Sequence, residues 1–254
     1  MPGAIDVTLD AVIVAVTDDR PRILTLAGST GPPRIPSGPL EPERDKTLEQ
    51  AMRRWIDQLA GVSIGYAEQL YTFGDHTRGR MRDLPGRWLS VAYLALVREE
   101  VPAPGASWVD VYDLFPWEDH RQGGPPIIGE ALLPALDDWA VSAPGADERG
   151  RRRERISVMF GQEAGWDGIR VLERYELLYE AGLVGEAHID AGAPATDRTA
   201  GTTMALDDRR IAATALGRLR GKLTYRPVVF ELLPDRFTLS TLQRTVEALS
   251  GVRT

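Results

Sequence analysis

The stretch IPSGPLEPERDKTLEQAMRRWIDQLAGV, residues 35–62, decides the fold of this chain. Its first part is rich in Pro and Gly and predicts a loop. Thr47 can then begin a helix, because its hydroxyl can accept from a free backbone N–H group, and Gly61 can end that helix. Between these two residues, apolar side chains recur every three or four positions, at Leu48, Ala51, Met52, Trp55, Ile56 and Leu59. The pattern predicts an amphipathic helix that packs on a core.

Apolar segments on both sides of this helix predict a sheet. The run DVTLDAVIVAV (6–16) and the segment 22–27 are separated by the turn-like TDDRP, so we expect two buried strands. Further strands are predicted at 64–73, 87–98 and 107–112. We therefore expect an α/β (α+β) protein in which a mixed sheet is sandwiched between helices.

The region after Leu114 changes to helical periodicity. Helices are predicted at 129–141, 151–161 and 167–181, and we interpret them as a helical insertion. Residues 190–203 are small and polar and predict a flexible connector.

Two further helical units are predicted near the C-terminal end. One runs from Asp207 to about Leu223. The final stretch YRPVVFELLPDRFTLSTLQRTVEALSG predicts two short helices, the second capped by Thr238 or Ser240 and ended by Gly251. Two short helices joined by a tight turn are how a helix-turn-helix unit begins.

Composition limits the class of protein. The chain has 254 residues, 43% of them hydrophobic, which is enough for a full core. No stretch approaches the roughly 18 apolar residues of a membrane span, and the start lacks the build of a secretory signal, so we expect a cytoplasmic protein. There is no cysteine, and His76, His120 and His188 lie far apart in sequence, so no metal site is expected.

The charge of the chain argues against indiscriminate binding to nucleic acid. The net charge is −7, whereas affinity for phosphate backbones depends on Lys and Arg. Two local basic runs stand out, RGRRRER at 149–155 and the region 209–226. We interpret both as solvated helix faces.

The loop and helix at 35–62 resemble the Nudix motif, whose helical half reads Arg-Glu-apolar-X-Glu-Glu-X-Gly-apolar. That pattern falls on Arg54 to Val62, where the Arg, both apolar positions and the Gly match. The three glutamates are missing, and their positions hold Trp55, Gln58 and Leu59. In the loop, IPSG stands for the usual apolar-Pro-Gly-Gly.

The missing glutamates remove the chemistry of the motif. Mg²⁺ requires oxygen ligands, and a face with an indole, an amide and an isobutyl group cannot hold it against a diphosphate. Asp57 and Glu49 lie at other angles of the helix and do not substitute. We therefore predict no catalytic residue and no metal. Two alternatives stay open: a residual hydrolase that uses Glu41 or Glu43, and a dimerisation or scaffold module that binds no nucleotide.

A motif without its acids can still leave a nucleotide cleft, because basic side chains contact phosphate without a metal. The candidate ligand-binding residues are Arg54, Arg44, Lys46 and Arg80. For Arg54 the alternative is a surface arginine paired with Glu49 or Asp57. For the others the alternative is a solvated loop charge. We interpret Trp55 as part of the core.

Three segments are similar to the Nudix-related transcriptional regulators of bacterial NAD synthesis: residues 35–61, YAEQLYTFGD with SVAYLALVR, and above all LGRLRGKLTYRPVVFELLPDRFTLSTLQRTVEALSG. The resemblance implies a Nudix-like domain whose first part is 1–113, a helical insertion and linker at 114–203, the last helix of the Nudix-like domain at 204–226, and the start of a winged helix-turn-helix domain at 227–254.

The resemblance also implies a function. The expected protein is a homodimeric repressor that requires no cofactor, senses an NAD-related nucleotide such as ADP-ribose, NAD or ATP, and binds operator DNA of NAD-synthesis genes. Residues that could contact DNA are Arg236, Ser240, Thr241, Gln243 and Arg244. In the family, FTLSTLQRTVEALSG is followed by a recognition helix and a wing, whereas this sequence stops at Thr254. This difference indicates either a truncated chain, which is the interpretation we favour, or a member of the family that senses without binding DNA alone. We expect weak or no specific DNA binding from these 254 residues.

Overall fold

A mixed six-stranded sheet forms the centre of the computed structural model, which describes residues 5–28, 31–74, 87–161, 165–193 and 199–253. Five strands follow the order β4-β5-β1-β2-β6, and β3 pairs with β1. The β1–β5 pair is parallel, and the other pairs are antiparallel. The strands are β1 (Ile5–Thr17), β2 (Arg20–Leu26), β3 (Ser37–Pro39), β4 (Tyr66–Phe73), β5 (Arg87–Leu96) and β6 (Ala106–Asp110).

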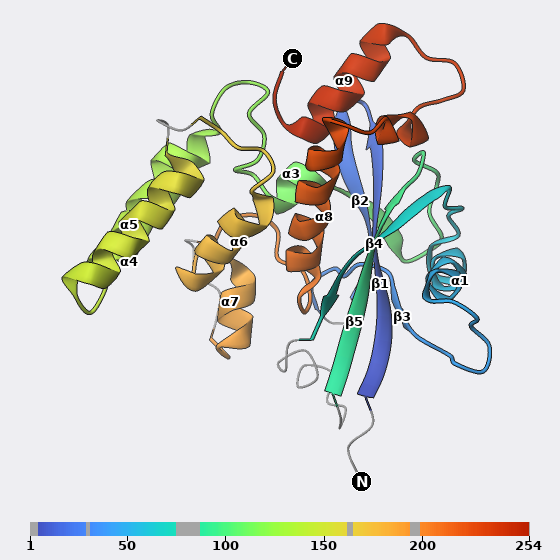
Figure 1. The fold of residues 1–254 in the computed structure, drawn as a ribbon, viewed down its shortest axis with the longest axis horizontal. Helices are drawn as coiled ribbons and strands as arrows, with labels where there is room; N and C mark the ends of the chain where they lie inside the picture. The colour runs from blue at the N-terminus through green and yellow to red at the C-terminus, as the bar shows by residue number, and fades with distance from the viewer. Residues whose placement is uncertain (1–4, 29–30, 75–86, 162–164, 194–198, 254) are drawn as a thin grey trace.

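The turn between β1 and β2 follows from its sequence. Asp18 and Asp19 have positive φ angles of 52° and 59°. A two-residue hairpin turn of this kind matches the twist of the flanking strands, and aspartate is one of the few residues that tolerate this conformation. The turn projects from the sheet next to the C-terminal helix (Figure 1).

Helix α1 (Leu48–Ala60) covers one face of the sheet and confirms the predicted helix. The hydroxyl of Thr47 accepts from the backbone N–H of Gln50 at 3.1 Å, and Gly61 ends the helix with a φ of 66°. Its buried side chains join alternate residues of the sheet in one core, namely Ala51, Met52, Ile56 and Ala60. Trp55 and Leu59 are only partly buried, because the apolar face is narrower than the sequence pattern suggests.

Helix α8 (Asp208–Leu223) covers the opposite face, so that the sheet lies between two helices, as predicted (Figure 1). Ile211, Ala215 and Leu219 pack against Val12 and Leu94 in a second core. Alternation along β1 explains the two cores, because successive strand residues point to opposite faces.

The helical insertion extends from the α8 side of the sheet, and α6 packs on α8. The short helix α3 (Val111–Leu114) leads into it, and it contains the π-helix η1 (Ile128–Leu132), α4 (Leu133–Val141), α5 (Ala146–Phe160), α6 (Val171–Glu180) and α7 (Gly185–Asp190).

Three predicted boundaries shift in this region. Helix α5 begins at Ala146 instead of residue 151. β6 ends at Asp110 instead of residue 112, because the Asp110 carboxylate accepts from Tyr112 N–H at 2.8 Å and begins α3. α6 begins at Val171 instead of 167, because the Asp167 carboxylate accepts from Ile169 N–H and holds a separate turn.

The chain continues into the 3-10 helix η2 (Val228–Leu232) and α9 (Leu239–Ser250), which are the two predicted short helices. Thr238 caps α9 by accepting from Thr241 N–H at 3.1 Å, and Gly251 ends it with a φ of 75°. Among the described residues, no helix combines the length and the apolarity needed to cross a membrane.

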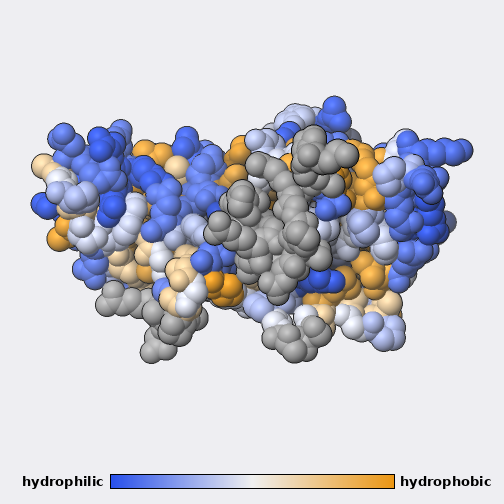
Figure 2. Space-filling model, turned by 90° about the horizontal axis from the view of Figure 1, so that it is seen from below, coloured by the Kyte–Doolittle hydropathy of each residue, from blue (hydrophilic) through white to orange (hydrophobic). Residues whose placement is uncertain are grey.

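The two basic runs have different outcomes. Residues 149–155 lie on α5 and are exposed or partly exposed, so that prediction is confirmed. Figure 2 shows hydrophilic residues at both ends of the molecule, one of which is the end formed by α4 and α5. The prediction for 209–226 is wrong, because Arg209, Arg220 and Lys222 of α8 are buried. Each is paired with a glutamate from another element, which neutralises the charge in the interior.

Candidate functional site

The face of α1 that would carry the glutamates is occupied by packing interactions. The ring of Trp55 lies directly on Gly38 of β3, where an added Cβ would come within 2.2 Å of the indole. The indole N–H donates to the carbonyl of Pro39 at 2.7 Å. Trp55 therefore packs on β3 at the edge of the protein, and the prediction that it is part of the core is wrong, because the ring is only partly buried and belongs to neither core. Gln58 is exposed beside it, and Leu59 is partly buried.

This face provides few ligands for a divalent cation. Gln58 contributes one amide oxygen, whereas Mg²⁺ prefers carboxylates and water. Within the described part of the chain, no cluster of three or more Asp, Glu or His side chains could hold a metal ion.

Arg54 is bound to acids of the preceding loop. Its Nε and Nη2 donate to Asp45 at 3.0 and 2.7 Å, and its Nη1 donates to Glu41 at 3.1 Å. The alternative partners of the sequence analysis are wrong: Glu49 pairs with Arg53, and the carboxylates that bind Arg54 are those of Asp45 and Glu41. The hydrogen bonds from Arg54 lower the pKa of Asp45. Arg54 therefore fixes the loop to α1.

Two other predicted ligand contacts, Arg44 and Lys46, lie on this loop. Arg44 is mostly exposed, with its Nη1 3.7 Å from the Glu41 carboxylate, and Lys46 is exposed two residues later. Arg80 lies outside the described residues. The structure thus brings Arg44 and Arg54 to the same carboxylate. Glu41, the acid considered for a residual hydrolase, is engaged in ion pairs with both, whereas Glu43 is exposed.

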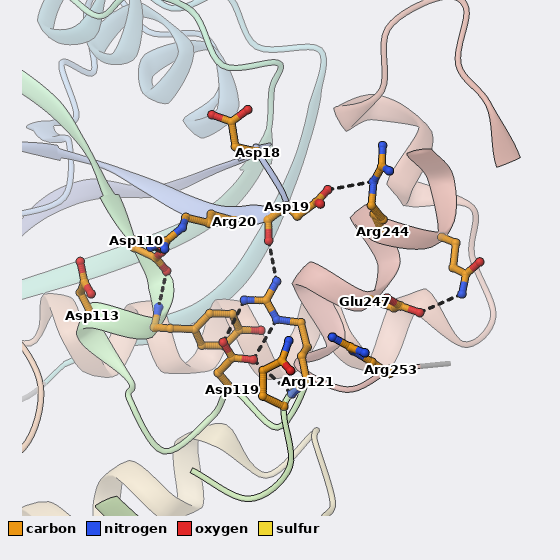
Figure 3. A pocket seen from close by; sticks show the side chains of 13 residues that line it. Asp18, Asp19, Arg20, Asp110, Asp113, Asp119, Arg121, Arg244, Glu247 and Arg253 are labelled. Atoms are coloured by element: carbon orange, nitrogen blue, oxygen red, sulfur yellow. Dashed lines mark hydrogen bonds and ion pairs between the residues drawn. The ribbon is translucent and has the colours of Figure 1, made fainter. Parts of the chain in front are cut away.

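The predicted DNA contacts divide into two groups on and before α9. Arg236 and Ser240 are exposed, and Thr241 is held by the cap residue Thr238. Arg244 instead faces the β1–β2 turn, where it pairs with Asp19 at 3.2 Å, and Gln243 donates to Glu247 at 2.9 Å within α9 (Figure 3).

A highly charged pocket of about 640 Å³ lies where this turn, the start of α3 and α9 meet (Figure 3), and we refer to it as the junction pocket. Arg20 pairs with Asp110 at 2.9 Å, and Arg121 pairs with Asp119 at 2.8 Å. Although burial acts in the opposite direction, the hydrogen bonds from Arg121 lower the pKa of Asp119. Sequence reasoning missed this pocket, for which the only local signal is the Asp-Asp turn.

A buried ionic cluster fixes α9 to the rest of the molecule. The carboxylate of Glu118 accepts from Arg174 of α6 at 2.7 and 3.0 Å, and it also pairs with Arg220 of α8. Arg220 donates through Nε to the carbonyl of Leu249 at 2.9 Å. Tyr112 donates to Ala248 O at 2.6 Å in the same turn of α9. The insertion, α8 and α9 are therefore joined through one carboxylate.

Comparisons with known proteins support the fold. Neither a scan of protein-family models nor a search of curated proteins gave a match. Among solved structures, Shewanella oneidensis NrtR is 19% identical and aligns over 98% of this chain and 79% of its own, with a TM-score of 0.58. The chain has a Nudix-like fold.

Two further structures agree with this assignment. The same NrtR complexed with a 27mer DNA is 19% identical over 98% of this chain and 77% of its own, with a TM-score of 0.55. A MutT/nudix family protein from Enterococcus faecalis is 17% identical over 99% of this chain and 75% of its own, with a TM-score of 0.56. The Nudix-like fold predicted from residues 35–62 is thereby confirmed, and with it the resemblance in architecture to the Nudix-related regulators.

Proposed function

We propose that this chain is a ligand-sensing transcriptional regulator whose Nudix-like domain binds an NAD-related nucleotide without hydrolysing it. The observation that carries the proposal is the position of Trp55. Its indole lies on Gly38 and donates to Pro39, where a metal-binding glutamate would be needed. A hydrolase of this type requires a metal ion to neutralise the diphosphate and activate water.

Nucleotide binding needs only part of that machinery. Arg44 and Lys46 stand exposed on the loop before α1, where a diphosphate could contact them. Arg54, through Asp45 and Glu41, holds this loop in place. We expect ADP-ribose, NAD or ATP as the effector, with no cofactor required.

The DNA-binding part of the proposal rests on α9 and on the comparison. NrtR, which shares the fold, has been crystallised with a 27mer DNA. The junction pocket and the Glu118 cluster connect α9 to the Nudix-like domain, so a ligand that changes the domain can change the position of α9. We propose that a homodimer of this protein represses NAD-synthesis genes by binding operator DNA.

One pair of measurements tests the sensing function. The protein is incubated with ADP-ribose and Mg²⁺ or Mn²⁺, and AMP release is measured; in parallel, thermal unfolding is followed with ADP-ribose, NAD and ATP. We expect no AMP, and a stabilisation of about 2.7 kcal/mol when a ligand is present at about 100 times its Kd. Clear turnover would establish the alternative hydrolase. The absence of any stabilisation by all three nucleotides would favour a scaffold module.

A further inference from the structure

The helical insertion contains a cavity of about 560 Å³ that the proposed function does not use. Pocket volumes of a few hundred to about 1,000 Å³ are typical of small-molecule sites. Its walls come from the turn before η1, from the start of α4 and from the end of α5, and they are mainly apolar: Pro125, Ile128, Leu133, Phe160 and Trp166. We refer to it as the insertion cavity.

One wall of the insertion cavity is a fixed aromatic stack. The ring of His120 stacks on Trp166 with a centroid distance of 3.8 Å and an interplanar angle of 29°. The guanidinium carbon of Arg174 lies 3.7 Å from the Trp166 ring centroid. Burial lowers the pKa of His120, which favours the neutral imidazole. Phe160 adds a second ring, tilted by 50° relative to Trp166. His120 and Arg174 cover the two faces of the Trp166 ring, so its edge and the ring of Phe160 are left for a ligand. Aromatic rings pair edge-to-face as well as stacked, so these rigid walls suit a planar aromatic molecule.

The charge of the lining restricts the ligand further. Among the described residues that line the cavity there is no lysine or arginine, and the one carboxylate is that of Glu130, which is exposed. A phosphate or carboxylate ligand would find no counter-ion there, whereas a cation would find Glu130. The nucleotides expected for the Nudix-like domain are therefore poor candidates for this cavity.

We propose that the insertion cavity is a second binding site, for a small planar aromatic compound that is neutral or cationic, and that occupancy of the cavity stabilises α9. The binding site itself does not depend on the proposed function. The idea that its ligand regulates DNA binding through α9 rests on the proposed function.

The connection to α9 runs through the aromatic stack. The backbone N–H of His120 donates to Gly251 O, at the end of α9, at 2.7 Å. Arg174, behind Trp166, binds Glu118, which pairs with Arg220, and Arg220 donates to Leu249 O. His120 and Arg174, which both contact the Trp166 ring, thus lead to the same turn of α9. A ligand that packs against this stack therefore stabilises the contacts that hold the turn.

Binding can be tested with three bicyclic probes of nearly equal size: quinoline, 1-methylquinolinium and quinoline-2-carboxylate, titrated into the full chain by calorimetry. We expect quinoline and 1-methylquinolinium to bind, and quinoline-2-carboxylate to bind about tenfold more weakly or worse. If none of the three binds, or if the carboxylate binds as tightly as the cation, the proposed site is overturned.

A blocking variant locates the binding. Gly129 of η1 lines the cavity, and a Cβ at this position would meet no atom within 4 Å, so Gly129→Leu can fill the space without a backbone clash. Gly150 of α5 is equally open but does not line the cavity, so Gly150→Leu is the matched control. We expect about a tenfold loss of affinity in G129L and none in G150L. Equal binding by G129L and G150L would contradict the assignment of the cavity.

Hydrogen exchange tests the effect on α9. With 1-methylquinolinium bound, the amide hydrogens of His120 and of the last turn of α9 should exchange at about half their rate in the free protein, or more slowly still. The G129L substitution should remove this effect. Unchanged exchange in the ligand-bound wild type would overturn the coupling. Binding of ADP-ribose to the same protein preparations is measured separately. If ADP-ribose binds but the quinoline probes do not, the second site is wrong and the proposed sensing function stands.

Discussion

Arg220 of α8 pairs with the buried carboxylate of Glu118 and, through its Nε, donates to the last turn of α9. The two residues are 102 positions apart in the sequence. Glu118 is fully buried and also binds Arg174, so one carboxylate faces two buried guanidinium groups. The arrangement makes the position of α9 depend on the packing of the insertion against α8.

The first prediction concerns this cluster. Glu118→Gln leaves two buried arginines without a counter-charge, and we expect a loss of about 3–5 kcal/mol in the free energy of unfolding, measured with urea. Glu148→Gln is the control, because Glu148 pairs with Arg151 and Arg152 on the solvated face of α5. It should cost far less than Glu118→Gln, because solvent screens an exposed ion pair. Equal effects of the two substitutions would refute the role assigned to Glu118.

The second prediction concerns pH. Bonding to Arg54 lowers the pKa of Asp45 below its ordinary value of 3.8. The ion pair therefore contributes stability that is fully present above pH 3.8 and is lost as the pH falls through the lower pKa of the folded protein. The difference in unfolding free energy between wild type and Asp45→Asn should be constant from pH 7 to about 5 and shrink below pH 3.8. A difference that grows on acidification would have the wrong sign.

A third prediction concerns metal removal. Because Trp55, Gln58 and Leu59 provide no carboxylate, nucleotide binding should not need a divalent ion. The thermal stabilisation by ADP-ribose should be the same in EDTA as in Mg²⁺, apart from the effect of Mg²⁺ on the free nucleotide. Abolition of binding by EDTA would show that the protein holds a metal after all.

The fourth prediction addresses the junction pocket and rests on the proposed DNA binding. Asp19→Asn removes the partner of Arg244 while keeping the turn, since asparagine also tolerates a positive φ. Without Asp19 as its partner, Arg244 can contact a DNA phosphate. The binding free energy for duplex DNA at low salt should then become more favourable by about 0.2–1 kcal/mol, the usual contribution of an exposed ion pair, as measured by fluorescence anisotropy. Asp18→Asn makes the same change in charge and turn chemistry and is the control. An equal gain from both would indicate a general charge effect.

The sequence by itself determined the elements whose signals are local. Thr47 and Gly61 fix the ends of α1, and Thr238 and Gly251 fix the ends of α9, because a cap acts on N–H and C=O groups within one helical turn. Apolar periodicity likewise places five of the six described strands and α8, whereas β3 (Ser37–Pro39) lies within the stretch that was predicted to be a loop. The absent glutamates could be seen in the same way, since their spacing is defined within α1.

Only the tertiary structure decided which charges meet. Arg54 binds Asp45 of the loop, and Arg220 binds Glu118, although closer acids were available along the chain to Arg54. A charged side chain can pair with any opposite charge that folding brings near it. Burial strengthens the attraction between the two charges, but it also removes their hydration, so the net effect on stability depends on the surrounding hydrogen bonds. The sequence pattern could therefore count the basic residues of α8, but it could not show that Arg209, Arg220 and Lys222 are enclosed by the protein and not by water.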